Sequence, residues 1–203
     1  MSTTQQKTSW PEAFAAAEDL RSLFVDCYDR WEFAGSVRRR AAVVGDVEHV
    51  LLARSMPDPD QRTLFGDATR TVSCVRHRVD QLVAEGLVRL HDYGGGRNRF
   101  GEKYIGLDHN GRMHELFIAV PENWGAILAI RTGPAEWSKA MVTRMYRYGY
   151  CMRDGRLCKR KHELDETGRQ RDVATPMECP DEETFFKAAG LEVIDPRNRR
   201  GPP

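Results

Sequence analysis

The spacing of apolar residues predicts alternating helices and strands along most of the chain. Residues 11–28 carry apolar side chains at the three- and four-residue intervals of one helix face, and residues 71–85 repeat this spacing before Gly86 ends it. Between these helices, residues 31–34 and 47–53 are short apolar runs of the length typical of strands. The first half of the chain therefore predicts a helix, two strands and a second helix.

The second half continues with strands and then turns helical. Asn110-Gly111 favours a tight hairpin and lies between two apolar runs of strand length. The elements predicted in this half are strands at 87–93, 103–107 and 113–120 and helices at 124–130, 135–148 and 181–189. Residues 55–67 have the Pro, Asp and Gly content of a loop, and residues 197–203 predict a loose end. The fold class predicted is α+β, with a mixed β-sheet flanked by helices.

Size and charge limit what the chain can be. With 203 residues and 40% hydrophobic content, it can form one domain, or one domain with a small appendage. Its 31 basic and 30 acidic residues leave a formal net charge of +1, so any nucleic-acid surface must be local. Basic residues gather between 139 and 171, which predicts a basic stripe. Residues 159–173 fit a solvated, partly disordered loop equally well.

Cysteine content and hydropathy bear on the cellular setting. The five cysteines are odd in number and show no paired C-x-x-C spacing, and no apolar run is long enough for a signal peptide or a membrane span. We therefore expect a reducing, cytoplasmic setting. Cys74 and His77 lie three residues apart, but a zinc site needs a second pair, which the sequence lacks.

Acidic residues on two predicted strands suggest a metal site. Asp46 and Glu48 are two residues apart, so the two-residue period of a strand places both carboxylates on one face. Glu115 lies on the later strand 113–120, and strand pairing could bring it beside them. Carboxylate oxygens suit Mg²⁺, and two ions about 4 Å apart can hold the attacking and leaving oxygens of a displacement in line. A solvated acidic strand face is the alternative.

A glycine-serine turn precedes these acids. Gly35-Ser36 lies ten residues before Gly45-Asp46, with Arg38 and Arg39 between them. Backbone amides and a hydroxyl in such a turn can bind phosphate, and the arginines can neutralise it. The same residues also fit an ordinary helix cap followed by a solvated arginine face.

Together, these two segments resemble a known signature. FAGSVRR at 33–39, followed by VGDVE at 44–48, is similar to the nucleotidyltransferase motif of the family X DNA polymerases. The resemblance continues at RFGEKY 99–104, ELF 115–117, NWG 123–125, RTG 131–133, AGL 189–191 and DPR 195–197. It covers residues 14–198 and is closest to the compact versions found in phage genomes. It implies a nucleotidyltransferase palm at 11–123 and a small thumb-like subdomain at 124–203, and the polar residues before the palm, 1–10, are predicted to be disordered.

The resemblance also implies roles for individual residues. Asp46 and Glu48 would bind two magnesium ions, for which manganese can substitute, and Glu115 would bind the ion that activates the acceptor hydroxyl. The other implied contacts are Gly35, Ser36, Arg39 and Gly45 with the triphosphate, Arg131, Thr132, Gly133 and Ser138 with the nucleotide, and Lys139, Arg144 and Arg147 with DNA. Arg38 would brace the fold. The implied partners are nucleoside triphosphates and a DNA primer or primer-template, and the protein would be a monomer without membrane contact in a bacterial or phage-infected cell.

Three features of the sequence qualify this resemblance. Glu115 replaces the family's usual Asp and is one methylene longer, so the acceptor-side ion is expected to be displaced. Ile130-Arg131 stands where larger relatives have two aromatic residues under the incoming sugar. The family turns from palm to thumb through a cis peptide bond after Thr-Gly, so the resemblance implies a cis bond at Gly133-Pro134, which proline would make easier to hold.

Two other interpretations remain open. Residues 73–107 can form a winged helix, with a recognition-like helix at 75–83 and a wing ending in strand 103–107, which would make the protein a DNA-binding regulator without catalysis. Alternatively, the catalytic fold is kept and the acceptor is RNA, protein or a small molecule. The six histidines show no ligand spacing and are expected to be packing or surface residues.

Overall fold

The chain folds into two compact units. The computed structural model describes residues 7–59, 70–164, 166–167 and 169–201. Unit 1 comprises Met1–Phe33 and Ala42–Ile118, and unit 2 comprises Ala34–Ala41 and Ala119–Pro203. The division after Ile118 lies close to the palm and thumb boundary expected at residue 123, but the segment containing Gly35-Ser36 groups with unit 2. Both units contain helices and strands, which confirms the α+β class.

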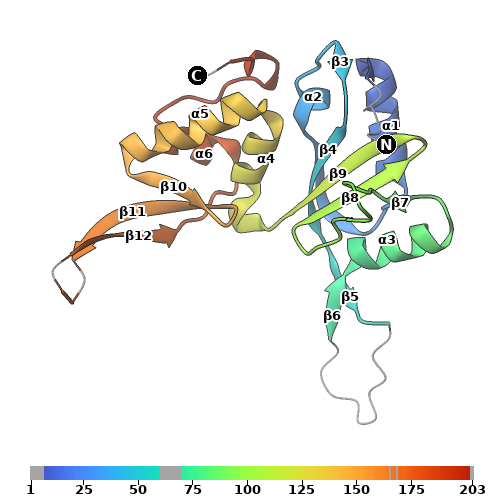
Figure 1. Cartoon of the computed structure of the whole chain (residues 1–203), viewed down its shortest axis with the longest axis horizontal. Coiled ribbons are helices and arrows are strands. Elements are labelled where there is room, and N and C mark those ends of the chain that lie inside the picture. Colours follow the sequence, from blue (N-terminus) through green and yellow to red (C-terminus); the bar gives the residue numbers. More distant parts are fainter. Residues whose placement is uncertain (1–6, 60–69, 165, 168, 202–203) are drawn as a thin grey trace, which may run out of the picture. The chain divides into compact units, whose positions relative to one another are not determined.

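Unit 1 is built on a five-stranded sheet with the strand order β2-β4-β9-β8-β7 (Figure 1). Its strands are β2 (Tyr28–Phe33), β4 (Val47–Ala53), β7 (Arg89–Leu90), β8 (Tyr104–His109) and β9 (Arg112–Ala119), and its helices are α1 (Trp10–Ser22) and α3 (Cys74–Ala84). Two small pairs, β1 (Thr8–Ser9) with β3 (Val43–Val44) and β5 (Ser55–Pro57) with β6 (Thr71–Ser73), complete it.

The core of unit 1 follows from the periodicity of its helices. α3 buries Val75, Val79 and Leu82, spaced four and three residues apart, and α1 contributes Leu20. These side chains belong to one cluster with alternate residues of the sheet, including Trp31, Leu51, Ile105, Leu107 and Leu116. Burying apolar side chains of this kind contributes about 1.5–3 kcal/mol each. One face of the sheet is therefore fixed against the helices.

The β8–β9 hairpin was predicted correctly. Asn110 and Gly111 have φ values of 48° and 74°, the left-handed conformations that a two-residue hairpin turn needs. They set the pairing of His109 with Arg112 and, further along, of Gly106 with Glu115. The turn residues thus fix which side chains of the two strands share a face.

Unit 2 combines helices with a three-stranded antiparallel sheet, and β11 and β12 form its long hairpin (Figure 1). Its helices are α2 (Gly35–Arg38), α4 (Trp124–Thr132), α5 (Ala135–Met145) and α6 (Glu182–Ala188), with short 3-10 turns η1 (Pro121–Asn123), η2 (Tyr146–Tyr148) and η3 (Pro196–Asn198). Its strands are β10 (Tyr150–Arg153), β11 (Arg156–Leu164) and β12 (Gln170–Pro176). Trp137, Met141, Leu157, Phe185 and Phe186 form the centre of its core.

The chain ends and the loops differ from the sequence prediction. Residues 159–173, compatible with a loop in sequence, belong largely to β11 and β12, and residues 55–57 form β5. At the amino terminus, Thr8–Ser9 pairs with β3 and α1 begins at Trp10, while the rest of the expected disordered segment, residues 1–6, lies outside the described residues. The predicted loose end contains Arg199, which is fully buried; residues 60–69 of the predicted loop and residues 202–203 are likewise outside the described part.

Cys27 and Cys74 are joined by a disulfide, which the sequence did not lead us to expect. Cys27 precedes β2 and Cys74 begins α3, so packing of the two segments brings together residues that lie 47 positions apart. Their Cα atoms are 5.0 Å apart, within the range that a disulfide spans. Among the described residues, no helix is both long enough and apolar enough to cross a membrane.

Candidate functional site

The two faces of the sheet in unit 1 carry different chemistry. On the helix-covered face, His49 Nε2 of β4 lies 3.0 Å from His114 Nδ1 of the neighbouring strand β9. Because side chains alternate along a strand, Glu48 and Glu115 must both lie on the opposite face. We call this opposite side of the sheet the carboxylate face. Two of the three predicted acids therefore share one face of adjacent strands.

Asp46 and Gly45 lie directly before β4. Asp46 is half-buried, and the strand begins at the next residue, Val47. The carbonyl of Gly45 accepts a hydrogen bond from Arg112 Nη1 at 3.4 Å, which ties the entry of β4 to the start of β9. The acid pair expected within one strand is thus divided between the residue before the strand and the strand itself.

The carboxylate of Glu115 accepts a hydrogen bond from one phenol and lies close to a second. Tyr104, also on the carboxylate face, donates its hydroxyl to Glu115 Oε1, and the Tyr93 hydroxyl lies 3.4 Å from the same oxygen. Within the part of the chain that the structure describes, no three His, Cys, Asp or Glu side chains lie close enough together to hold a metal ion. Asp46, Glu48 and Glu115 therefore do not form the three-residue ligand group that was expected among the described residues.

Behind the carboxylates lies a buried hydrogen-bond chain. Trp31 Nε1 donates to His49 Nδ1 at 3.1 Å, so His49 is neutral and carries its proton on Nε2, which donates to His114 Nδ1. Burial lowers the pKa of His49 well below its usual value and lowers the pKa of His114 to about 3. Both histidines pack in the core, as expected, but they also align the two strands that carry Glu48 and Glu115.

The Gly-Ser segment is anchored inside unit 2. Gly35 has φ 53° and begins α2, and Arg38 donates from Nη1 to Thr132 Oγ1 at 2.7 Å. Both terminal nitrogens of Arg38 also donate to Glu182, at 2.8 and 2.7 Å, which is a bidentate pair. Arg39 donates to the Thr132 carbonyl at 2.6 Å. Arg38 braces the fold as expected, and Arg39, predicted to contact triphosphate, is oriented by α4.

A second arginine completes this buried cluster. Arg199 Nη1 donates to Glu182 Oε1 at 2.7 Å, and its guanidinium lies 4.9 Å from the ring centre of Phe186 and 5.3 Å from that of Trp137. Burial raises the pKa of Glu182, but hydrogen bonds from Arg38 and Arg199 outweigh it, so the pKa lies below its usual value. One carboxylate therefore serves two cations.

The predicted nucleotide-contacting residues are mostly engaged within unit 2. Thr132 is buried and accepts from Arg38, and Ser138 Oγ donates to the Ile130 carbonyl at 2.7 Å. Arg131 is exposed. A Cβ on Gly133 would lie 2.1 Å from the Trp137 ring, so this glycine serves close packing.

The Gly133-Pro134 peptide bond is trans, so the prediction of a cis bond at this position is wrong. Gly133 adopts φ −70° and ψ 153°, and Pro134 adopts φ −63° and ψ 158° as the N-cap of α5. These ordinary extended angles turn the chain from α4 into α5 with a trans bond. Proline makes the cis form cheaper, but it does not favour it over trans.

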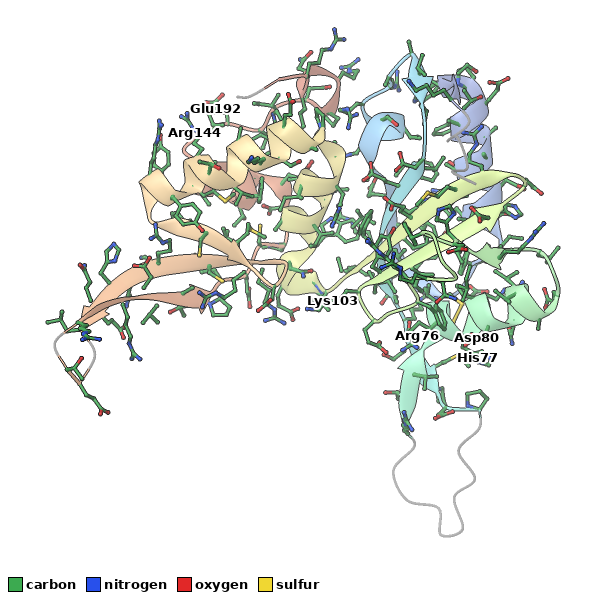
Figure 2. All side chains as sticks on the ribbon, viewed as in Figure 1. Arg76, His77, Asp80, Lys103, Arg144 and Glu192 are labelled. Atoms are coloured by element: carbon green, nitrogen blue, oxygen red, sulfur yellow. A yellow bond between two sulfur atoms is a disulfide. The ribbon has the colours of Figure 1, made fainter. Side chains whose placement is uncertain are left out.

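The three residues predicted to bind DNA differ in their surroundings. Lys139 and Arg147 are exposed. Arg144, labelled in Figure 2, donates from Nε to the Ala189 carbonyl at 2.7 Å and from Nη2 to the Tyr148 hydroxyl at 3.3 Å. Arg144 therefore ties α5 to the end of α6, which leaves Lys139 and Arg147 as the more accessible cations.

The roles of the two tyrosines and of the Arg199–Glu182 pair were not predicted from the sequence. Tyr104 falls on the predicted strand 103–107, but its proximity to Glu115 depends on the register of β8 and β9, which only the turn at Asn110-Gly111 could have indicated.

Compared with known proteins, the chain matches no protein-family model, and no curated protein matches it either.

Proposed function

We propose that this protein is a magnesium-dependent nucleotidyltransferase that moves a nucleoside monophosphate from a triphosphate to the 3′-hydroxyl of a DNA primer. The observation that carries the proposal is the placement of Glu48 and Glu115 on one face of adjacent strands, with Asp46 directly before the first of them. The supporting resemblance is the motif of residues 33–48, which is similar to the family X DNA polymerases. On this proposal, unit 1 acts as the palm and unit 2 as the thumb.

Carboxylate oxygens are ligands of the chemical type that magnesium prefers. Mg²⁺ is commonly bound by one or two carboxylates together with substrate phosphates and water, so it does not need a three-residue protein cage. One or two of Asp46, Glu48 and Glu115 would supply these carboxylate oxygens. Bound there, Mg²⁺ would stabilise charge on the transferring phosphoryl group and lower the pKa of the acceptor hydroxyl. The role of the protein's own residues is to orient these oxygens on rigid strands.

The Gly-Ser segment of unit 2 would bind phosphate. Ser36 and the backbone of Gly35 would hydrogen-bond phosphate oxygens. Arg39 would supply positive charge. Anchoring of Arg38 by Thr132 and Glu182 restrains this segment, so less conformational entropy is lost when phosphate binds.

The winged-helix interpretation has less support. The strand that would close the wing, β8, lies inside the five-stranded sheet between β9 and β7, and the apolar side of α3 packs against that sheet's core. A wing is an exposed hairpin that contacts DNA. These residues are instead used in the fold.

The decisive experiment measures incorporation of labelled nucleotides into a short primer-template with magnesium. Asp46→Asn should lower the rate by about 100-fold or more, because a neutral amide binds a divalent ion more weakly than a carboxylate. The matched control is Asp80→Asn on the exposed side of α3 (Figure 2), which should keep the wild-type rate. Equal thermal melting of all three proteins shows that folding is intact.

Further acceptors separate the remaining alternatives. RNA ends, a protein substrate and small hydroxyl compounds should be assayed in parallel with DNA, using both ribo- and deoxyribonucleoside triphosphates. Transfer to RNA alone would keep the catalytic site and change the acceptor. DNA binding without transfer to any acceptor would contradict the proposal and favour the non-catalytic interpretation.

The DNA surface can be tested through salt dependence. Each phosphate contact on duplex DNA contributes about 0.9 to the slope of log affinity against log salt concentration. Replacing exposed Lys139 and Arg147 with Ala should make that slope shallower by about two units, while Arg144→Ala should mainly destabilise unit 2. An unchanged slope in the double variant would place the DNA surface elsewhere.

A further inference from the structure

On the carboxylate face, Tyr93 and Tyr104 form a short hydrogen-bonded chain that ends on Glu115. The hydroxyls of Tyr93 and Tyr104 contact each other, and the Tyr104 hydroxyl contacts Glu115 Oε1. Each phenol has one proton to donate, and a carboxylate can only accept. The chain therefore runs in one direction, from Tyr93 to Tyr104 to the Glu115 carboxylate.

The two phenols leave one oxygen of Glu115 without a contact. Both contacts to Glu115 fall on Oε1, and for Oε2 we find no hydrogen bond within the described residues. The tyrosines thus fix one oxygen and leave the other available.

Gly106 makes this arrangement possible. It pairs with Glu115 across β8 and β9. A Cβ at this position would lie 2.4 Å from the Tyr93 hydroxyl oxygen and 3.0 Å from Cε2 of the same ring. The absent side chain lets the Tyr93 ring cross β8 and reach Tyr104. Gly106 has no positive φ, so its requirement here is space and not backbone conformation.

Arg99 covers the two rings. Its guanidinium carbon lies 4.6 Å from the ring centre of Tyr93 and 5.5 Å from that of Tyr104, which are cation–π distances. The backbone of Arg99 also accepts a hydrogen bond from the Gly106 amide at 3.0 Å. Phe117 packs beside Tyr104 at 5.0 Å between ring centres. The rings are therefore held from several sides.

We infer that Tyr104 and Tyr93 are positioning residues for Glu115: they fix its Oε1 so that Oε2 faces the acceptor side of the proposed transfer site. The inference rests on the proposed function for its catalytic consequence, whereas the positioning itself is independent of it.

The first test separates turnover from substrate binding. Tyr104→Phe should lower kcat for primer extension about tenfold, the usual effect of losing a hydrogen bond to a charged group, and should leave KM for the triphosphate within about twofold. Gly106→Ala should lower kcat similarly by displacing Tyr93. Tyr28→Phe in the same unit keeps its ring contact with Trp31 and should match wild type.

The second test does not depend on activity. Glu115→Met keeps the side-chain length but removes both acceptor oxygens, so it deletes the same hydrogen bond as Tyr104→Phe. Urea unfolding midpoints of the two single variants and the double variant should therefore be non-additive, with the double variant close to the more damaged single variant. Glu115→Met combined with Tyr28→Phe is the control pair and should be additive.

The outcomes divide clearly between the two proposals. Additive midpoints for Tyr104→Phe and Glu115→Met would show that the tyrosine does not hold the carboxylate and would overturn the inference. Non-additive midpoints with an unchanged kcat would remove its catalytic consequence. Non-additive midpoints with no transfer by the wild type would refute the proposed function and leave the positioning of Glu115 supported.

Discussion

Two buried polar clusters of this protein avoid the cost of an unpaired buried charge in opposite ways. In unit 1, Trp31, His49 and His114 form a chain in which every member is uncharged. In unit 2, Arg38 and Arg199 share the single carboxylate of Glu182 and are charged throughout. Burying an uncompensated charge is expensive, so a cluster must either stay neutral or contain its own counter-charge.

The comparison shows how each unit stabilises its functional segment. The neutral cluster, which consists of Trp31, His49 and His114, lies on the face of the sheet opposite the carboxylate face. It aligns β4 with β9 without adding charge near the carboxylates there. The ionic cluster, which consists of Arg38, Arg199 and Glu182, anchors the segment Ala34–Ala41 to α4 and α6. A neutral cluster is vulnerable to acid, and an ionic cluster is vulnerable to loss of one partner.

The largest effect should come from Glu182→Gln. It leaves the buried Arg199 and the half-buried Arg38 without their counter-charge, which should lower the free energy of unfolding by about 3–5 kcal/mol. Chemical denaturation measures this loss. Glu183→Gln, the exposed neighbour on α6, is the matched control and should change stability by less than about 0.5 kcal/mol. Similar losses in both variants would show that the cluster does not stabilise unit 2.

Trp31→Phe should have the next largest effect. It removes the donor to His49 Nδ1 and part of a buried ring, and together these should cost about 2–3 kcal/mol. Urea unfolding followed by circular dichroism measures the change. A loss below about 0.5 kcal/mol would mean that the indole contributes little to the neutral cluster.

Acid should weaken the neutral cluster before the ionic one. The pKa of His114 is lowered to about 3, whereas an unfolded histidine titrates near 6.5, so the unfolded state binds a proton that the folded state does not. The stabilisation is complete above pH 6.5 and is lost as the pH falls below it, at about 1.4 kcal/mol per pH unit for each such histidine. His114→Gln should reduce this slope between pH 6.5 and 5. If the variant keeps the same dependence of the unfolding free energy on pH, that dependence must come from other titrating groups.

The pKa of Glu182 is lowered, so its contribution is lost only as the pH falls below the usual glutamate range. The two clusters should therefore fail in different pH windows, the neutral one first. Hydrogen exchange at pH 5.5 can test this unit by unit. Protection should fall in β4 and β9 and persist in α4 and α6.

The smallest effect should come from Thr132→Val. Arg38 Nη1 loses one acceptor at 2.7 Å but keeps Glu182, so the cost should be about 1 kcal/mol. A loss as large as that of Glu182→Gln would indicate that Thr132, and not the ion pair, holds Arg38 in place.

The sequence predicted the elements whose signals are local. Residues 47–53 form β4 as expected, and the turn at Asn110-Gly111 and the apolar stripe of α3 were both found. β11 and β12 were missed because their exposed charged residues hide the strand pattern, and they are stabilised by pairing with each other.

The candidate site was only partly predictable for a similar reason. The alternation within a strand places Glu48 on one face of β4. Its relation to Glu115 depends on the pairing of β4 with β9, in which His49 contacts His114, a residue 65 positions later in the sequence. Tyr93 reaches Glu115 only because Gly106 leaves space, which a sequence does not reveal. Arg199 looked like part of a loose end because its counter-charge lies on α6, outside its local sequence.

The grouping of Ala34–Ala41 with unit 2 bears on how this gene can be divided. The chain passes from one unit to the other after Phe33, after Ala41 and after Ile118, so no single cut yields two complete halves. A fragment ending at residue 118 would carry Arg38 without Glu182, and its complement would carry Glu182 and Arg199 without Arg38. Recombination at a single point could therefore not exchange the two units intact, because the first part of the gene encodes a segment of unit 2, Ala34–Ala41, as well as the whole of unit 1.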